Sequence, residues 1–449
     1  MSKVSSKVRS LAWFAQAAAP AALACLFPAC GSSSDGGGGG AAGSAGRAGS
    51  AGSSAGESAT AGDGNKAGAG DTGGSSGSGT TAGAGGAAQG GADTVAGAGG
   101  SVAHGGASSI DYGNPTVPEA KWTNITNNLA NMASECGNVG GIFPSPYLDL
   151  LLVGVARQGL WSSADGGATY KKIGTTGDMI LNRTIMLVWD PSDTKTFWES
   201  GIYGFENPFT DGVFKTTDNG ASFKGYAALA TIQSHNDSVS IDFSDPARKT
   251  MIAGGHEQTD VLFRSTDAGA TWTDIGKSLV ASHGFCTATL VLDSKTMLVG
   301  CAAGYSGKAG GILRSSNGGD AWTEVSSKGV FGQPLWAADG TIYWSGEGGG
   351  MYASTDQGKT FSAVADQNTA GAVRPIELPD GSIASIAQKT LKLSTDKGKT
   401  WQAIGSALPW DPTGISYSPF RRAFYAWHFD CGVVVPADSL QRYGFDFKK

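Results

Sequence analysis

The sequence is poor in histidine and in charged residues for its length. Only 5 of the 449 residues are histidine, 16% are charged, and the formal net charge is −6. The chain from residue 113 onwards holds no cluster of basic residues, which argues against a nucleic-acid partner. It also lacks an apolar run of about 18 residues, so no membrane-spanning helix is expected there. No C-x-x-C pair is present, which argues against a cysteine-ligated metal, and no cofactor is predicted.

The first 30 residues have the pattern of an export signal. A basic start with Lys3, Lys7 and Arg9 precedes the apolar run 11–27. This run leads into FPAC, ending at Cys30, and a Gly/Ser tether follows, which is similar to the lipobox of bacterial lipoproteins. We predict a signal peptide over 1–30 and an outer-membrane anchor on Cys30, with Cys25 as the alternative lipid site and plain secretion left open.

Residues 31–112 consist almost entirely of Gly, Ala, Ser and Thr. Such a segment has too few apolar side chains to offset the conformational entropy of folding, so we predict a disordered linker. The folded part is expected to span residues 113–449 and to be a monomer displayed outside the cell.

One short pattern occurs six times in the folded part. It has Ser or Thr, then Asp or Asn two residues later, then Gly and an aromatic residue, at intervals of 39 to 53 residues. The copies begin at Ser163, Thr216, Ser265, Ser315, Ser354 and Ser394. A catalytic centre occurs once, so the six copies indicate a repeat architecture. An Asp that accepts backbone hydrogen bonds, with Gly between two short apolar runs, predicts a hairpin turn.

These turns resemble the Asp-box, or BNR repeat, and the resemblance covers roughly residues 113–449. Asp-boxes occur in sialidases, xyloglucan-cleaving glycoside hydrolases, the sortilin ectodomain and non-catalytic propellers such as a photosystem II assembly factor. The resemblance implies a β-propeller fold. It leaves the activity open, because the group mixes enzymes with binding proteins.

We predict an all-β fold, a single seven-bladed β-propeller with four strands in each blade. In the third blade the strands are expected at SVSIDFSDP, KTMIAGGHE, VLFRSTD and ATWTDI. The six turns mark six blades. The seventh is expected to combine strands at 414–420, 423–432 and 433–437 with an N-terminal strand at 120–125, which would close the ring and remove its free sheet edges.

Four cysteines remain after the signal, and they allow three pairings. Cys286 and Cys301 flank one hairpin, while Cys136 and Cys431 lie at the two ends of the ring closure. We predict the disulfides Cys286–Cys301 and Cys136–Cys431, which suit an oxidising compartment.

All four histidines of the folded part are expected on one face, in loops that precede a first strand or follow a second strand. We predict a catalytic group made of Asp237, Glu257, His256 and His235. The two carboxylates could serve as the acid and base of a glycosidase, or as a loop cap and a solvated side chain. His235, His256 and His283 could bind a metal, but hydrogen bonding is the preferred interpretation and no metal site is predicted.

Substrate-binding candidates surround this group. Arg157, Arg183 and Arg374 could hold an acidic sugar by bidentate contacts or could form surface ion pairs. The other candidates are Glu206, Asn236, Gln258, His283, Glu347, His428 and Asp430, and the aromatic residues expected nearby are Tyr203, Phe205, Tyr305 and Trp410.

The sequence departs from both enzyme families. The Arg-Ile-Pro motif of sialidases is absent, and GGIFPSP (140–146) stands in its place. Residues 140–161 are similar to the opening strands of the xyloglucan-cleaving enzymes. In that family a catalytic aspartate follows an Ala-Arg pair, whereas Gln158 follows Arg157 here.

We therefore predict an exported surface propeller that acts on or binds an extracellular polysaccharide, with a glycoside hydrolase-like activity favoured. The alternatives are a non-catalytic propeller that binds a protein or glycan, and a sialidase-like exo-glycosidase.

Overall fold

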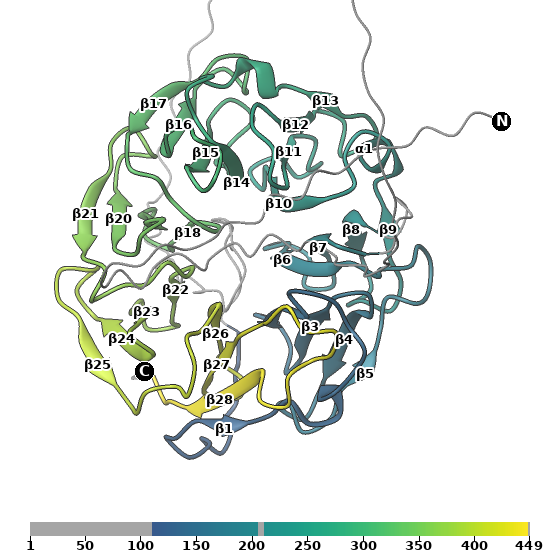
Figure 1. Cartoon of the computed structure of the whole chain (residues 1–449), viewed down its shortest axis with the longest axis vertical. Coiled ribbons are helices and arrows are strands. Elements are labelled where there is room, and N and C mark those ends of the chain that lie inside the picture. Colours follow the sequence, from purple (N-terminus) through teal and green to yellow (C-terminus); the bar gives the residue numbers. More distant parts are fainter. Residues whose placement is uncertain (1–109, 205–210, 448–449) are drawn as a thin grey trace, which may run out of the picture. The chain divides into compact units, whose positions relative to one another are not determined.

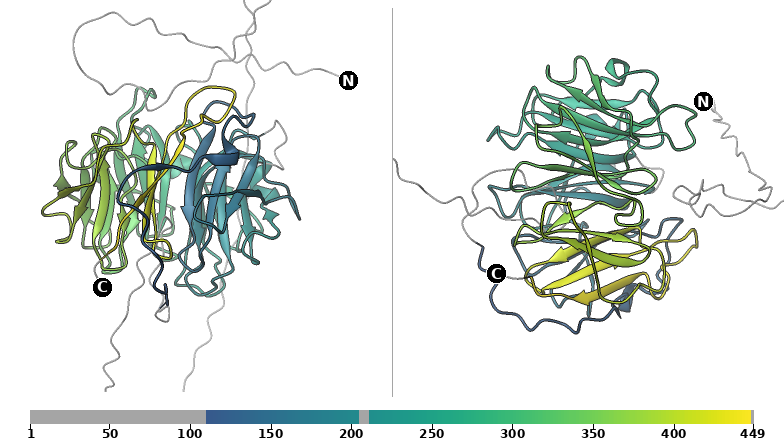
Figure 2. Two further views of the ribbon diagram at one scale, coloured as in Figure 1. Left: turned by 90° about the horizontal axis from the view of Figure 1, so that it is seen from below. Right: turned by 90° about the vertical axis from the view of Figure 1, so that its left-hand side faces the viewer.

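The computed structural model describes residues 110–204 and 211–447. These residues form seven antiparallel four-stranded sheets arranged around one axis, which is a seven-bladed β-propeller with almost no helix (Figure 1). The side views show the strands of each blade running along that axis (Figure 2). The predicted all-β, seven-bladed fold is confirmed. No helix among the described residues is long and apolar enough to cross a membrane.

The strands follow the chain blade by blade. Blade 1 consists of β2 (Val139–Pro144), β3 (Leu151–Val155), β4 (Gly159–Ser163) and β5 (Lys171–Lys172), and blade 2 of β6 (Arg183–Trp189), β7 (Phe197–Ile202), β8 (Gly212–Thr216) and β9 (Lys224–Gly225). Blade 3 consists of β10 (Asn236–Ile241), β11 (Met251–Gly255), β12 (Leu262–Ser265) and β13 (Thr273–Asp274), and blade 4 of β14 (Phe285–Val291), β15 (Met297–Ala302), β16 (Gly311–Ser315) and β17 (Thr323–Ser326). Blade 5 consists of β18 (Leu335–Trp336), β19 (Ile342–Ser345), β20 (Met351–Ser354) and β21 (Ser362–Ala365), and blade 6 of β22 (Ile376–Glu377), β23 (Ile383–Ala387), β24 (Thr390–Ser394) and β25 (Gln402–Ile404). Blade 7 consists of β26 (Gly414–Ser418), β27 (Ala423–Trp427), β28 (Leu440–Gly444) and the N-terminal β1 (Thr123–Asn124). The short helices are α1 (Ala227–Ala230) and the 3-10 turns η1 (Asn127–Leu129) and η3 (Gly276–Ser278).

The N-terminal strand closes the ring, as predicted. In β1, Thr123 lies opposite Arg442 of β28, and the Ile125 amide donates to the Leu440 carbonyl at 2.9 Å. The prediction of the third strand of this blade at 433–437 was wrong, because the strand lies at β28. Pro436 has no N–H for a ladder, and Val434 bridges to Ala133 instead of pairing with β27.

Each of the six repeated patterns forms the turn between the third and fourth strands of a blade. In blade 3 the Asp267 carboxylate accepts hydrogen bonds from the amide and hydroxyl of Thr271, at 2.8 and 2.5 Å, and from the Ser265 hydroxyl at 2.8 Å. The Gly269 amide donates to the Ser265 hydroxyl oxygen, and Gly269 has a φ of +87°, which favours glycine. The aromatic Trp272 packs against the apolar cluster between blades 2 and 3. The pattern is therefore a structural turn, as predicted.

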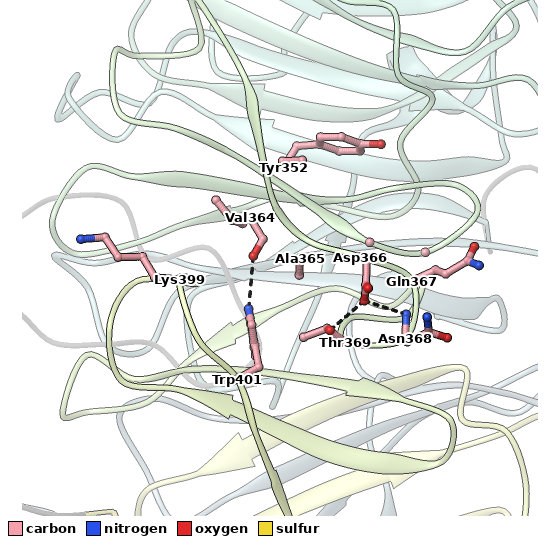
Figure 3. Close-up of a pocket in the computed structure, with 12 residues that line it drawn as sticks. Tyr352, Val364, Ala365, Asp366, Gln367, Asn368, Thr369, Lys399 and Trp401 are labelled. Atoms are coloured by element: carbon pink, nitrogen blue, oxygen red, sulfur yellow. Dashed lines mark hydrogen bonds between the residues drawn. The ribbon is translucent and has the colours of Figure 1, made fainter.

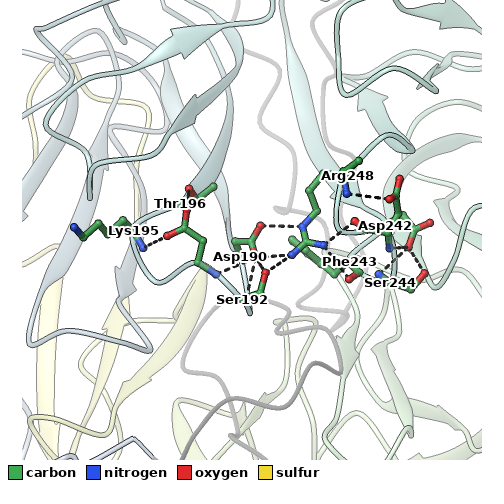
Figure 4. Close-up of polar contacts among 11 residues, drawn as sticks. Asp190, Ser192, Lys195, Thr196, Asp242, Phe243, Ser244 and Arg248 are labelled. Carbon is green, nitrogen blue, oxygen red and sulfur yellow. Dashed lines mark hydrogen bonds and ion pairs between the residues drawn. The ribbon is translucent and has the colours of Figure 1, made fainter.

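Polar contacts also join neighbouring blades. Arg248 of blade 3 donates from Nε and Nη2 to the two carboxylate oxygens of Asp190 in blade 2, at 2.9 and 2.8 Å (Figure 4). Burial opposes ionisation of Asp190, but the hydrogen bonds from Arg248 and Ser192 hold its pKa below the ordinary value. This bidentate pair links the turns between the first and second strands of the two blades.

Both predicted disulfides are present. Cys136 pairs with Cys431 across the ring closure, and Cys286 pairs with Cys301 between β14 and β15. Disulfides are typical of exported proteins.

The predicted signal peptide and nearly all of the predicted linker lie outside the described residues. Two residues assigned to the end of the linker, Ile110 and Tyr112, pack on the propeller, with the Tyr112 ring 5.1 Å from that of Phe420.

Candidate functional site

A cavity of about 390 Å³ opens along the propeller axis. Its walls come mainly from the first strands of the blades and from the loops after the second strands. Its lining includes the polar and charged residues Arg183, Tyr203, Asp237, His256, Glu257 and Arg374. Arg183 and Asp237 lie where first strands begin, and the repeated turns lie where third strands end. Because neighbouring strands are antiparallel, the site and the repeated turns are at opposite ends of the blades.

A larger groove of about 830 Å³ lies on blades 5 and 6, between Tyr352 and Trp401 (Figure 3). It is open to solvent, and its one carboxylate, Asp366, accepts hydrogen bonds from Asn368 and Thr369 of its own turn. Its lining does not gather acid and base groups, so the axial cavity is the better candidate for chemistry.

A β-bulge places Asp237 at the cavity. The register of β10 on β11 shifts between Asn236, which lies opposite Gly255, and Ser238, which lies opposite Gly254. Asp237 is the extra residue, and bulges of this kind redirect a side chain next to functional sites. Asn236, a predicted substrate-binding residue, is fully buried, and its amide donates to the Gly254 carbonyl at 3.2 Å.

His256 lies at the centre of the site and joins three side chains. Its Nδ1 lies 2.8 Å from Asp237 Oδ1, and its Nε2 lies 2.7 Å from the Tyr203 hydroxyl oxygen and 3.7 Å from Glu257 Oε1. The carboxylate of Asp237 accepts, so Nδ1–H donates to it. Nε2 then either accepts from the Tyr203 hydroxyl or, in the imidazolium, donates to it. The arrangement is a hydrogen-bonded chain from carboxylate to imidazole to phenol.

The surroundings shift the pKa values of this chain. Burial favours the neutral ring of His256, but the charge and hydrogen bond of Asp237, together with the charge of Glu257, oppose it, and the pKa of His256 is raised. Burial, followed by the charge of Glu257, raises the pKa of Tyr203 to about 12. Burial and a hydrogen bond to Glu257 raise the pKa of Tyr305 as well. Tyr203 and Glu257 both have positive φ, at +55° and +50°, a strained backbone that is often found at functional sites.

Arg183 forms part of the cavity wall beside this chain. Its guanidinium contacts two aromatic rings, with Cζ 5.1 Å from the centre of Tyr203 and 5.2 Å from that of Phe429. The residue is only 8% exposed, and burial lowers the pKa of the guanidinium. Gly137 leaves the space for it, because a Cβ on Gly137 would overlap Nη1. Arg374 lines the same cavity, and burial lowers its pKa to about 10.

Three of the four predicted catalytic residues thus line the cavity, and the fourth, His235, is not among its lining residues. The ring of His235 is 5.6 Å from that of Tyr203 and 6.5 Å from that of His256, and its Nε2 is 3.4 Å from Asp211 Oδ2. His235 therefore packs edge-on against the Tyr203 ring.

The other predicted histidines do not join the site. His283 is 1% exposed, and its Nε2 lies 3.1 Å from Glu324 in the outer strand of blade 4. His428 packs on Trp410, with 4.3 Å between the rings, and lies 3.6 Å from Asp438. The described residues contain no group of three or more His, Cys, Asp and Glu arranged to hold a metal ion.

Most of the remaining predicted binding residues have structural contacts. Arg157 forms an ion pair with Glu135, Glu347 accepts the amides of Ala303 and Gly304, and Asp430 accepts a hydrogen bond from Asn138 at the ring closure. None of these three lines the cavity, and neither does the exposed Gln258. Glu206 and Phe205 lie outside the described residues.

The sequence interpretation missed Phe429 and Glu135. Phe429 follows β27 of blade 7, and the charge of Glu135, which precedes blade 1, raises the pKa of Arg183 against the effect of burial. The predicted Cys136–Cys431 disulfide was the signal for both, because each of them is within two residues of a bridged cysteine.

The fold is shared with solved structures of several kinds. An enzyme of glycoside hydrolase family 74 from Niastella koreensis matches with a TM-score of 0.50 and 14% identity, over 70% of this chain and 53% of that one. A family 74 xyloglucanase from Xanthomonas campestris matches with a TM-score of 0.47 and 15% identity, over 72% of this chain and 55% of that one. YCF48 bound to a D1 peptide matches with a TM-score of 0.46 and 15% identity, over 74% and 100%.

At 14% identity the match to the Niastella koreensis enzyme shows the fold and not the activity. The chain spans about half the length of the family 74 enzymes it resembles. No protein-family model matches the chain, and no curated protein matches its sequence.

Proposed function

We propose that this propeller acts on an extracellular polysaccharide at the axial cavity, by acid–base chemistry of Asp237, His256, Tyr203 and Glu257. The observation that supports it is the hydrogen-bonded chain through His256, with 2.8 Å to Asp237 and 2.7 Å to Tyr203 inside a cavity wall. A histidine whose second nitrogen is held by a carboxylate is a common general acid or base.

The two carboxylates stand on opposite ring nitrogens of His256. Asp237 is in contact with Nδ1, whereas Glu257 lies 3.7 Å from Nε2. One imidazole ring therefore separates them, which is compatible with the carboxyl spacing of about 6.5–9.5 Å in inverting glycosidases. A sialidase-like activity is less well supported, because Arg157 pairs with Glu135 outside the cavity, so the three predicted arginines do not converge.

We also propose that the six turns are Asp-boxes and that the chain is exported and tethered through Cys30. The two disulfides fit an oxidising compartment. A monomer tethered in this way would present the cavity to polymers outside the cell.

The test is a polysaccharide panel with neutral and acidic polymers, incubated with the purified full chain and assayed for new reducing ends. Asp237→Asn and Glu257→Gln should remove the activity. Asp320→Asn, at an exposed aspartate paired with Arg264 outside the cavity, is the control that should keep it. Cleavage that persists in both cavity variants would disprove the site. Binding without cleavage by the unmodified chain would favour the non-catalytic alternative.

A further inference from the structure

Arg183 is the feature that the hydrolase-like proposal leaves without a role. It is a buried guanidinium in a cavity wall, and its Nε is buried without a hydrogen-bond partner among the described residues. Asp237, Glu135 and Glu257 influence its pKa through their charges, but none forms an ion pair with it. A buried N–H donor without an acceptor costs about 1–3 kcal/mol, so the arrangement suits a ligand that brings the acceptor.

The geometry around Arg183 defines that acceptor. The rings of Tyr203 and Phe429 pack on the guanidinium, and Gly137 lies against Nη1. A guanidinium fixed in this way is suited to a planar, bidentate anion, of which a carboxylate is the simplest. Arg374 in the same lining adds positive charge to the cavity.

The position of Tyr203 then limits the chemistry. One ring face of Tyr203 contacts Arg183, and its hydroxyl group contacts His256. A sugar whose carboxylate binds Arg183 would have its α-carbon, the atom next to the carboxylate, close to the Tyr203 hydroxyl. An acidic C–H next to a neutralised carboxylate is the group that a base removes in an elimination.

We propose that the substrate is a polymer containing uronic acids and that the site cleaves it by β-elimination, with Arg183 binding the carboxylate of the reacting sugar. The proposal rests on the function proposed above and names its substrate class and reaction. It departs from that proposal in two respects, because no water is added to the glycosidic bond and Glu257 takes no part in the proton transfers.

The step balances without any further reactant. Tyr203 takes the proton from C5 of the uronate while its own phenolic proton moves to Nε2 of His256, where Asp237 stabilises the imidazolium. The C5–H electron pair forms the C4=C5 double bond, and the C4–O4 bond breaks with its electron pair on O4. The proton returns from His256 through Tyr203 to O4. The products are a 4,5-unsaturated uronate and a new reducing end.

The experiment uses the purified full chain with three polymers, each of one uronic acid: polygalacturonate, polymannuronate and polyglucuronate. The same polymers, with their carboxyl groups chemically reduced to alcohols, form the matched control set. Two products are followed together, reducing ends and the ultraviolet absorbance of the conjugated unsaturated uronate. We expect both signals from at least one polyuronate, in equal amounts, and neither signal from its reduced form.

Variants then separate binding from turnover. Arg183→Met should lower kcat/KM by at least about 100-fold, since two charge-assisted hydrogen bonds are lost. Tyr203→Phe should abolish turnover and leave binding of the polyuronate, measured by calorimetry, within a few-fold of the unmodified chain. Arg314→Met, at an arginine on β16 that donates to the Gln357 carbonyl, is the control that should change neither.

The outcomes distinguish the two proposals. Reducing ends without the unsaturated product, or equal cleavage of the carboxyl-reduced polymer, would overturn the elimination and leave the function proposed above intact. No cleavage and no binding of any polymer would overturn both. The comparison of acid and reduced polymers needs no variant, so it decides the question even if Arg183→Met does not fold.

Discussion

Removing the disulfide between Cys136 and Cys431 should destabilise the propeller more than removing the one between Cys286 and Cys301. The first pair is separated by 295 residues and the second by 15. In the chain-entropy model a disulfide stabilises by restricting the unfolded chain, by about 5.7 kcal/mol for the longer loop and about 3 kcal/mol for the shorter one. Two Cys→Ser double variants should therefore differ in free energy of unfolding by about 2–3 kcal/mol.

The ring-closing disulfide should also matter for the site. Next to it, the Gly137 amide donates to the Asp430 carbonyl at 2.7 Å, and the Asn138 side chain donates to the Asp430 carboxylate at 2.7 Å. These contacts keep Gly137 and Phe429 around Arg183. We therefore expect the Cys136/Cys431 variant, but not the Cys286/Cys301 variant, to bind a polyuronate more weakly.

The assay is equilibrium unfolding in denaturant, followed by tryptophan fluorescence. The two variants are measured under non-reducing conditions, and the unmodified chain with both disulfides reduced is measured in reductant as a third sample. The slope with denaturant reports changes in the unfolded state and must be compared as well as the midpoint. Equal losses of stability in the two variants, or a larger loss for Cys286/Cys301, would refute the reasoning. The ring would then be closed by the pairing of β1 with β28 rather than by the covalent bond.

Three further predictions concern single positions around the cavity. Gly137→Ala should weaken polyuronate binding, because a Cβ there overlaps the Arg183 guanidinium, and should lower stability, because Gly137 has a φ of +75°. Unchanged binding in calorimetry would contradict the assigned position of the guanidinium. Asp237→Asn should lower the pKa of His256, measured by NMR titration, because the charge and hydrogen bond of Asp237 are the largest effects that raise this pKa against burial. In the unmodified chain, the raised pKa of His256 contributes stability that is complete below about pH 6.5 and is lost as the pH rises through the folded-state pKa. The free energy of unfolding of Asp237→Asn should therefore fall less over this pH range. Glu199 is fully buried in β7, and burial raises its pKa from 4.5 to about 8. The stability of the folded chain should therefore fall as the pH rises from about 4.5 to about 8. Denaturant midpoints measured across this range should show the fall, and Glu199→Gln should remove it.

The sequence by itself determined the architecture of the folded part. The six turn patterns encode their own local structure, because the Ser, Asp and Gly of each one form hydrogen bonds within a few residues. Their spacing then set the blade length, and the similarity of 120–125 to the other fourth strands located the ring closure. The third strand of blade 7 was misplaced because no copy of the turn follows it, so nothing local marked its end.

The composition of the site was only partly predictable. Asp237, His256 and Glu257 belong to loops of one blade. The order of strands and turns in that blade was enough to predict that these loops lie on one face of the propeller. Apart from the ring closure and its disulfide, contacts between blades were not predicted, since they join residues far apart in the chain, such as Arg183 with Phe429.

Tertiary structure alone decided which charged residues on that face contact one another. The sequence treated Arg157, Arg183 and Arg374 alike. The fold pairs Arg157 with Glu135 outside the cavity and buries Arg183 against two rings in the cavity wall. It likewise places His283 beside Glu324, and His256 within hydrogen-bond distance of Asp237 and Tyr203. The physical reason is that a turn is specified by hydrogen bonds between near neighbours in sequence, whereas the desolvation and charge environment of a side chain depend on every blade that surrounds it.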